Sequence, residues 1–175
     1  RNVNISALYS LKFERLFYYW EWKMKLIKKN FGFGCMRFPM KDSEVDIEET
    51  NRMVDAFIEA GFNYFDTAHG YLQGKSETAL KECLTKRYPR NAYILTDKLT
   101  GNFFKTEADI RPLFESQLEA CGVDYFDFYL MHAQSADIFK HFRECNAYET
   151  AFKLKEEGNR ITTVRGVGYR YEAMV

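Results

Sequence analysis

Four polar residues of this chain, Asp66, Tyr71, Lys98 and His132, could together form a proton-transfer site. Each lies at or just beyond the end of a short apolar run. A tyrosine phenol is a weak acid at neutral pH, and a neighbouring ammonium group favours its ionised form. Lys98 is suited to supply that ammonium, and Asp66 could hold Lys98 by a charge-assisted hydrogen bond. His132 could donate a hydrogen bond to the oxygen atom that Tyr71 protonates.

Each of these residues also has a purely structural explanation when it is taken singly. An Asp after a strand commonly caps a turn, and a Lys at a strand end is commonly solvated. A Tyr in a chain with 17% aromatic residues is commonly part of the core. The other two histidines, His69 and His141, are interpreted as structural.

Apolar runs and helical stretches alternate along the chain, which predicts βα units around a parallel sheet. In such a sheet the carboxyl ends of neighbouring strands meet at one edge, so side chains that follow successive strands come together. The expected strands are Phe31–Cys35, Asn63–Asp66, Ala92–Lys98 and Tyr125–Met131, and the expected helices are Asp46–Ala60, Lys75–Lys86, Glu107–Ala120 and Ala136–Glu157.

Four segments resemble the aldo/keto reductase family, in particular its bacterial branch with a C-terminal iron–sulfur region. They are GFGCMR (Gly32–Arg37), FDTAHGY (Phe65–Tyr71), LTDK (Leu95–Lys98) and LMH (Leu130–His132), and the resemblance runs from about Phe31 to about Asn159. GFGCMR is not a phosphate-binding G-x-G-x-x-G loop, because Arg37 stands where the third Gly should be.

The resemblance implies a (β/α)8 TIM barrel that reduces small aldehydes or ketones with NADP(H) or NAD(H). It implies that the catalytic residues are Asp66, Tyr71, Lys98 and His132. It also implies that Gly34, Cys35, Met36 and Asp66 lie beside the nicotinamide of the cofactor.

A complete barrel of this type has about 250 residues, whereas 145 residues follow from Phe31 to the end of this chain. We therefore expect an α/β fold that holds roughly the first four to five βα units, in residues 24–159. In the family, most contacts to the adenosine phosphates and all cluster-binding cysteines come later, so no iron–sulfur cluster is expected in this chain. Three interpretations follow: the first half of a reductase that is inactive by itself, a non-catalytic remnant and, as a weaker third, a DNA-binding regulator suggested by residues 161–172.

The two ends of the chain depart from the family pattern. Residues 1–23 form an extension that is interpreted as upstream reading frame or as a basic, aromatic helix on a membrane surface. Residues 160–175 form a divergent tail, in which Ile161–Glu172 resembles the C-terminal hairpin of winged-helix response regulators of the OmpR/PhoB kind. Alternatively, Val164–Gly168 corresponds to the fifth barrel strand.

Composition limits the partners. Lys+Arg and Asp+Glu number 25 each, so the overall charge predicts no nucleic-acid partner. The longest early apolar run, Leu16–Trp20, is too short for a secretion signal or a membrane span. Four widely spaced cysteines without metal-ligand spacing favour a reducing cytoplasm and no metal site. A small carbonyl substrate is the implied ligand, and the open edges of a partial sheet predict self-association.

Overall fold

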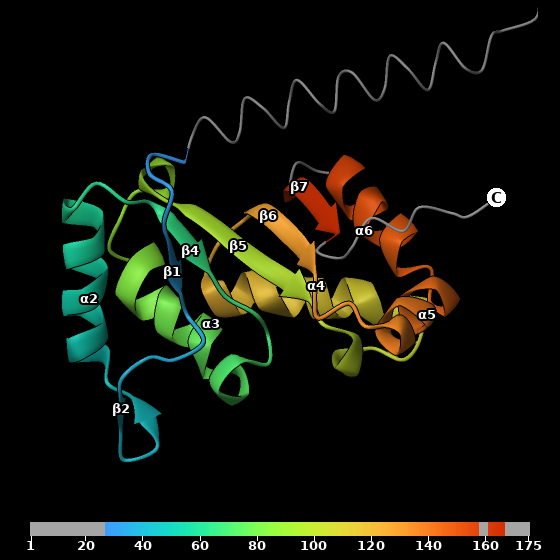
Figure 1. The fold of residues 1–175 in the computed structure, drawn as a ribbon, viewed down its shortest axis with the longest axis horizontal. Coiled ribbons are helices and arrows are strands. Elements are labelled where there is room, and N and C mark those ends of the chain that lie inside the picture. The colour runs from blue at the N-terminus through green and yellow to red at the C-terminus, as the bar shows by residue number, and fades with distance from the viewer. Residues whose placement is uncertain (1–26, 158–160, 167–175) are drawn as a thin grey trace, which may run out of the picture.

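The structure, a computed structural model, describes residues 27–157 and 161–166. These residues form a five-stranded sheet in the order β1-β4-β5-β6-β7, in which every neighbouring pair is parallel (Figure 1). The strands are β1 (Gly32–Gly34), β4 (Tyr64–Asp66), β5 (Ile94–Leu99), β6 (Phe126–Met131) and β7 (Ile161–Gly166). The helices are α2 (Ile47–Glu59), α3 (Lys75–Leu80), α4 (Glu107–Cys121), α5 (Ala136–Glu144) and α6 (Ala147–Glu156). The predicted α/β class with strands and helices in alternation is therefore confirmed.

Local sequence signals fix the ends of the two longest helices. The Asp46 carboxylate accepts a hydrogen bond from the Glu49 N–H at 3.0 Å and so caps the start of α2. Thr106 and Asp109 form a reciprocal capping box at the start of α4. Gly61 and Gly122 follow the two helices with φ of 84° and 65°, a left-handed conformation that favours glycine.

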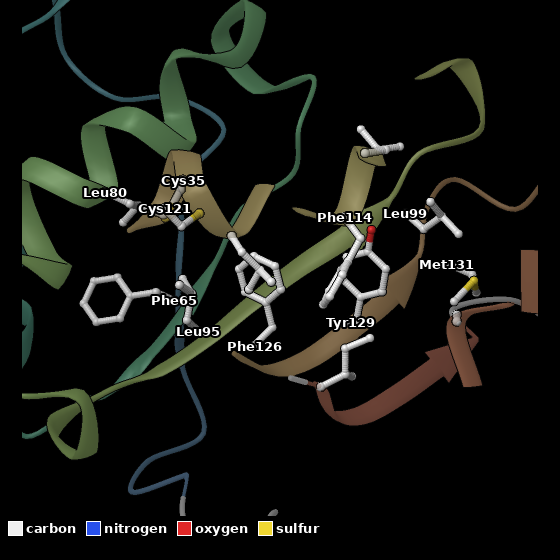
Figure 2. Packing of buried hydrophobic residues seen from close by; sticks show 14 of the residues in the cluster. Cys35, Phe65, Leu80, Leu95, Leu99, Phe114, Cys121, Phe126, Tyr129 and Met131 are labelled. Atoms are coloured by element: carbon white, nitrogen blue, oxygen red, sulfur yellow. The ribbon is translucent and has the colours of Figure 1, made fainter. Parts of the chain in front are cut away.

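The sheet carries two different faces, because successive side chains of a strand point to opposite sides. The helix-covered face bears the main core, and Figure 2 shows Phe65, Leu95, Phe126 and Tyr129 packed there. The other face bears a smaller buried cluster of Ile94, Phe128 and Leu130, which is packed by Tyr64 and Ile27. Strands β5 and β6 are buried throughout, as the continuous apolar run of β6 predicted.

The segment predicted as one helix, Ala136–Glu157, is two helices, so that prediction was wrong. Asn146 lies between α5 and α6 with a φ of 49°, which a continuous right-handed helix excludes. Its side-chain amide donates to Glu107 Oε2 at 2.8 Å, and this contact to α4 holds the break. The apolar periodicity continues across the break, which is why the sequence pattern concealed it.

A short hairpin was also not predicted. Strands β2 (Met40–Lys41) and β3 (Glu44–Val45) pair antiparallel around Asp42 and Ser43, whose φ values are 51° and 66°. Positive φ at both central residues is the signature of a type I′ hairpin turn. The predicted helix Lys75–Lys86 is present as α3 followed by a π-helical turn, η2 (Lys81–Thr85).

Strand β7 lies parallel to β6, with Ile161 beside Phe126 and Gly166 beside Met131. This is the pairing expected of a fifth barrel strand, the second interpretation of the tail. The residues that would complete a winged-helix hairpin, 167–172, lie outside the described residues, as does the 1–23 extension. None of the helices in the described residues combines the length and the apolar composition that a membrane span requires.

Candidate active site

Lys98 and Asp66 form the centre of the candidate site. Strands β4 and β5 are neighbours, and Asp66 is paired in register with Thr96, two residues before Lys98. The Lys98 ammonium donates to Asp66 Oδ1 at 2.5 Å and to the Thr67 carbonyl oxygen at 2.6 Å. Lys98 is only 7% exposed, so its charge depends on these partners.

Tyr71 lies against the ammonium group of Lys98. It begins the short helical turn η1 (Tyr71–Gly74), and its backbone N–H donates to the Ala68 carbonyl oxygen at 2.9 Å. The Lys98 Nζ atom lies 4.7 Å from the centroid of the Tyr71 ring. Leu72 and Gln73 continue the turn with φ of 52° and 59°, a strained backbone that reverses the chain directly after the tyrosine.

His132 completes the group from the end of β6. Its ring centroid lies 5.7 Å from that of Tyr71, and the two rings are nearly perpendicular at 81°. Its backbone N–H donates to the Leu99 carbonyl oxygen at 2.9 Å, which continues the pairing of β5 with β6. His132 Nδ1 lies 2.7 Å from the Thr100 hydroxyl oxygen. The structure therefore brings together all four residues that the sequence singled out.

The electrostatics of the site favour a charged lysine and a neutral histidine. Burial lowers the pKa of Lys98, but Asp66 and Tyr71 outweigh burial, and the net pKa lies above the ordinary value. Burial also lowers the pKa of His132, and the Lys98 ammonium lowers it further. At neutral pH an ammonium group thus contacts a phenol whose other neighbour is an uncharged imidazole, an arrangement suited to proton transfer.

The residues predicted to lie beside a nicotinamide occupy the end of β1. A Cβ built on Gly34 meets no atom within 4 Å, so the surface above this residue is open. Gly34 is paired in register with Asp66, and Met36 is 52% exposed. Cys35 is fully buried: its thiol contacts the Phe33 carbonyl oxygen at 3.5 Å, and its backbone N–H donates to the Asp66 carbonyl oxygen at 2.9 Å. Gly34 thus leaves open space next to Asp66, the partner of Lys98.

Two polar features near the site were not predicted from the sequence. One is Thr100, whose hydroxyl contacts His132 and which follows β5 directly. The other is a buried polar cluster behind the sheet that includes Asp97 and Glu77. The sequence does contain a signal for the buried position of Asp97. Side chains alternate along β5, so Asp97 lies on the same helix-covered face as Leu95 and Leu99.

Comparisons with known proteins agree with this geometry. The model of the aldo/keto reductase family matches residues 30–162. The 4-dihydromethyl-trisporate dehydrogenase of Mucor mucedo is 35% identical over 58% of this chain and 30% of its own length. The NAD(P)H-dependent D-xylose reductase of Pachysolen tannophilus is 33% identical over 65% of this chain and 33% of its own length.

Among solved structures, the holo form of aldo-keto reductase AKR11C1 from Bacillus halodurans superposes with a TM-score of 0.64 at 29% identity. The match covers 80% of this chain and 47% of that structure. The chain thus spans about a third of these curated relatives and about half of the solved structure. Because the family model matches most of the chain and the fold agrees with it, this chain belongs to the aldo/keto reductase family.

Proposed function

We propose that this chain carries the acid–base machinery of an NAD(P)H-dependent reductase that acts on small aldehydes or ketones. The observation that carries the proposal is the Lys98 ammonium group held between the Asp66 carboxylate and the Tyr71 ring. The alternative interpretation, a non-catalytic remnant, does not explain why this buried cation lies beside a phenol.

In this proposal Tyr71 gives its phenolic proton to the carbonyl oxygen of the substrate. The Lys98 ammonium stabilises the phenolate that remains, since opposite charge favours the ionised form. Asp66 keeps Lys98 charged and fixes its direction. His132 donates a hydrogen bond to the same substrate oxygen from Nε2.

Thr100 supports the role of His132. When the Thr100 hydroxyl donates to Nδ1, at the 2.7 Å observed, the proton of the neutral imidazole is on Nε2. This tautomer leaves the Nε2 N–H free to donate to a substrate oxygen. A histidine with the opposite tautomer would offer that oxygen a lone pair and repel it.

The cofactor proposal is NADP(H) or NAD(H), with Gly34, the Cys35 and Met36 backbone and Asp66 beside the nicotinamide. The open surface at Gly34 supports it, as does the name of the NAD(P)H-dependent relative. When bound, the nicotinamide supplies the hydride that the carbonyl carbon accepts. We propose that later βα units contact the phosphates of the cofactor. We also propose that the chain belongs to the iron–sulfur branch of the family and acts in the cytoplasm.

Oxidation of NADPH with a panel of small aldehydes tests the proposal. We expect negligible turnover by the chain alone, because an unanchored nicotinamide forfeits positioning that supplies about 7–11 kcal/mol. We expect turnover when residues 30–162 are joined to the remaining βα units of the Bacillus halodurans reductase. A folded hybrid that binds NADPH and yet reduces none of the aldehydes would support the non-catalytic remnant instead.

A further inference from the structure

Two carboxylic acid side chains lie buried side by side behind the candidate site. Asp97 of β5 is 0% exposed, and Glu77 of α3 is 1% exposed. The Gln117 amide nitrogen contacts both, at 3.0 Å from Asp97 Oδ1 and 3.4 Å from Glu77 Oε1. The Tyr129 hydroxyl donates to Gln117 Oε1 at 2.5 Å, which turns the amide nitrogen toward the acids.

Among the described residues, no lysine or arginine forms an ion pair with Asp97 or Glu77. His69 Nδ1 lies 3.0 Å from Glu77 Oε2 and so faces Glu77. The Lys98 ammonium lies on the opposite face of the sheet, where it is bound to Asp66. Two carboxylates that share one dry site repel each other, so one of them retains its proton.

The donors around each acid indicate which of them retains it. Asp97 Oδ1 accepts from the Lys98 backbone N–H at 2.7 Å and from Gln117, whereas the donor at Asp97 Oδ2 among the described residues is the Cys121 thiol, a weak donor at 3.9 Å. Glu77 has the imidazole of His69, whose pKa Glu77 raises. Burial, and after it the negative charge of Glu77, raises the pKa of Asp97 well above its ordinary range.

The remaining titratable groups that face the pair stay neutral at physiological pH. They are Cys121 from α4, Tyr129 from β6 and Cys35 after β1. Burial is the main cause that raises the pKa of all three.

We propose that Asp97 and Glu77 hold one proton between them, on Asp97, and that this acid pair positions Lys98 and Tyr71 from behind the sheet. Asp97 fixes the backbone N–H of Lys98. Glu77 holds His69, two residues before Tyr71, across the loop that carries the phenol. The importance of positioning Lys98 and Tyr71 rests on the proposed function, whereas the proton shared by Asp97 and Glu77 does not.

Asn at position 97 reproduces a protonated Asp, because its oxygen can accept from Lys98 and Gln117 while its NH2 donates to Glu77. An Asp with a raised pKa contributes stability that is fully present below about pH 3.8 and is lost as the pH rises through the folded pKa. The Asp97→Asn variant has no carboxyl group at this position, so it does not lose this stability as the pH rises. Relative to the variant, the unfolding constant of the unmodified chain should therefore grow by up to about tenfold per pH unit above pH 4.

Urea unfolding of both chains from pH 4 to pH 8 measures this ratio, and Glu82→Gln on the neighbouring surface turn is the matched control. A chain that becomes more stable than Asp97→Asn as the pH rises would overturn the shared proton. Infrared spectroscopy gives a second readout that needs no unfolding. We expect the unmodified chain to show a protonated carboxyl band at pH 7 that the Asp97→Asn variant lacks. An unmodified chain without this band would contradict the proposal.

Positioning is tested by nuclear magnetic resonance without substrate or cofactor. Glu77→Gln should lower the titration midpoint of His69 toward 6.5 and displace the ring signals of Tyr71, which Tyr71→Phe identifies. Asp97→Asn should leave both near their original values. Tyr71 signals that do not respond to Glu77→Gln would refute the positioning role. Because these readouts need no turnover, they fail or hold independently of the reductase proposal.

Discussion

Adjacent residues of β5, Asp97 and Lys98, carry ionisable groups to opposite faces of one sheet. Each buried group avoids an isolated charge in a different way. Lys98 is paired with Asp66, whereas Asp97 lies next to a second acid and retains its proton in our proposal. The difference follows from the partners: the cation on one face of the sheet lies next to a carboxylate, and the acid on the other face lies next to a second acid.

At this scale we expect Asp66→Asn to destabilise the chain by about 2–3 kcal/mol. The substitution leaves the nearly buried Lys98 ammonium without its carboxylate partner. Because Asp66 is partly exposed, we expect a smaller loss of stability than for a fully buried ion pair. Urea unfolding in dilute solution measures it. The control is Glu44→Gln, which breaks the exposed pair of Glu44 with Lys75 and should cost under about 1 kcal/mol. Equal costs for the two variants would contradict our view of the site.

The two histidines near Tyr71 should titrate in opposite directions from 6.5. Glu77 raises the pKa of His69, so the stability that His69 contributes is present below pH 6.5 and is lost as the pH rises through its folded pKa. Burial lowers the pKa of His132, so its contribution is present above pH 6.5 and is lost as the pH falls. Proton resonance titrations, assigned with His69→Gln and His132→Gln, check the order. A His132 that titrates above His69 would show that the burial described here is wrong.

At the scale of elements, sequence signals predicted most of the fold because helix caps and strand runs are local. The predicted helices Asp46–Ala60 and Glu107–Ala120 agree with α2 and α4 within one residue at each end. The break at Asn146 could not be predicted, since a contact to a distant helix decides it. The grouping of the four site residues followed from strand order, whereas the buried neighbours Glu77 and Gln117 depend on how α3 and α4 pack.

The break between α5 and α6 gives a test at this scale. Asn146→Ala should be less stable than Asn146→Gly by about 1 kcal/mol, because Ala resists the left-handed φ of 49° and Gly does not. Both variants lose the same hydrogen bond to Glu107, so their difference isolates the backbone. Urea unfolding measures the difference. If Ala is as stable as Gly, the segment is one helix after all.

On the scale of the whole molecule, β1 and β7 form the two edges of the sheet that the structure describes. Among the described residues, β1 pairs only with β4, and β7 pairs only with β6. Phe31 beside β1 is 66% exposed, and Met36 is 52% exposed. Unpaired strand edges and wet apolar side chains favour association.

We therefore predict that the chain self-associates when it is expressed alone. At about 25 cal/mol per Å² of apolar surface, a few hundred Å² left in water amounts to several kcal/mol, comparable to the stability of a small domain. Light scattering and near-ultraviolet circular dichroism are the measurements. A monodisperse monomer with a sharp cooperative melting transition would show that five strands are sufficient by themselves.

The central claim is that Tyr71 donates a proton to a substrate oxygen with help from Lys98. The most direct test is kcat for NADPH-dependent aldehyde reduction by the hybrid of residues 30–162 with the later βα units of the Bacillus halodurans reductase. Tyr71→Phe removes one hydroxyl from an otherwise unchanged site. We predict that kcat falls about 10²- to 10⁴-fold while NADPH binding is kept. An unchanged kcat in the folded Tyr71→Phe hybrid would contradict the assignment.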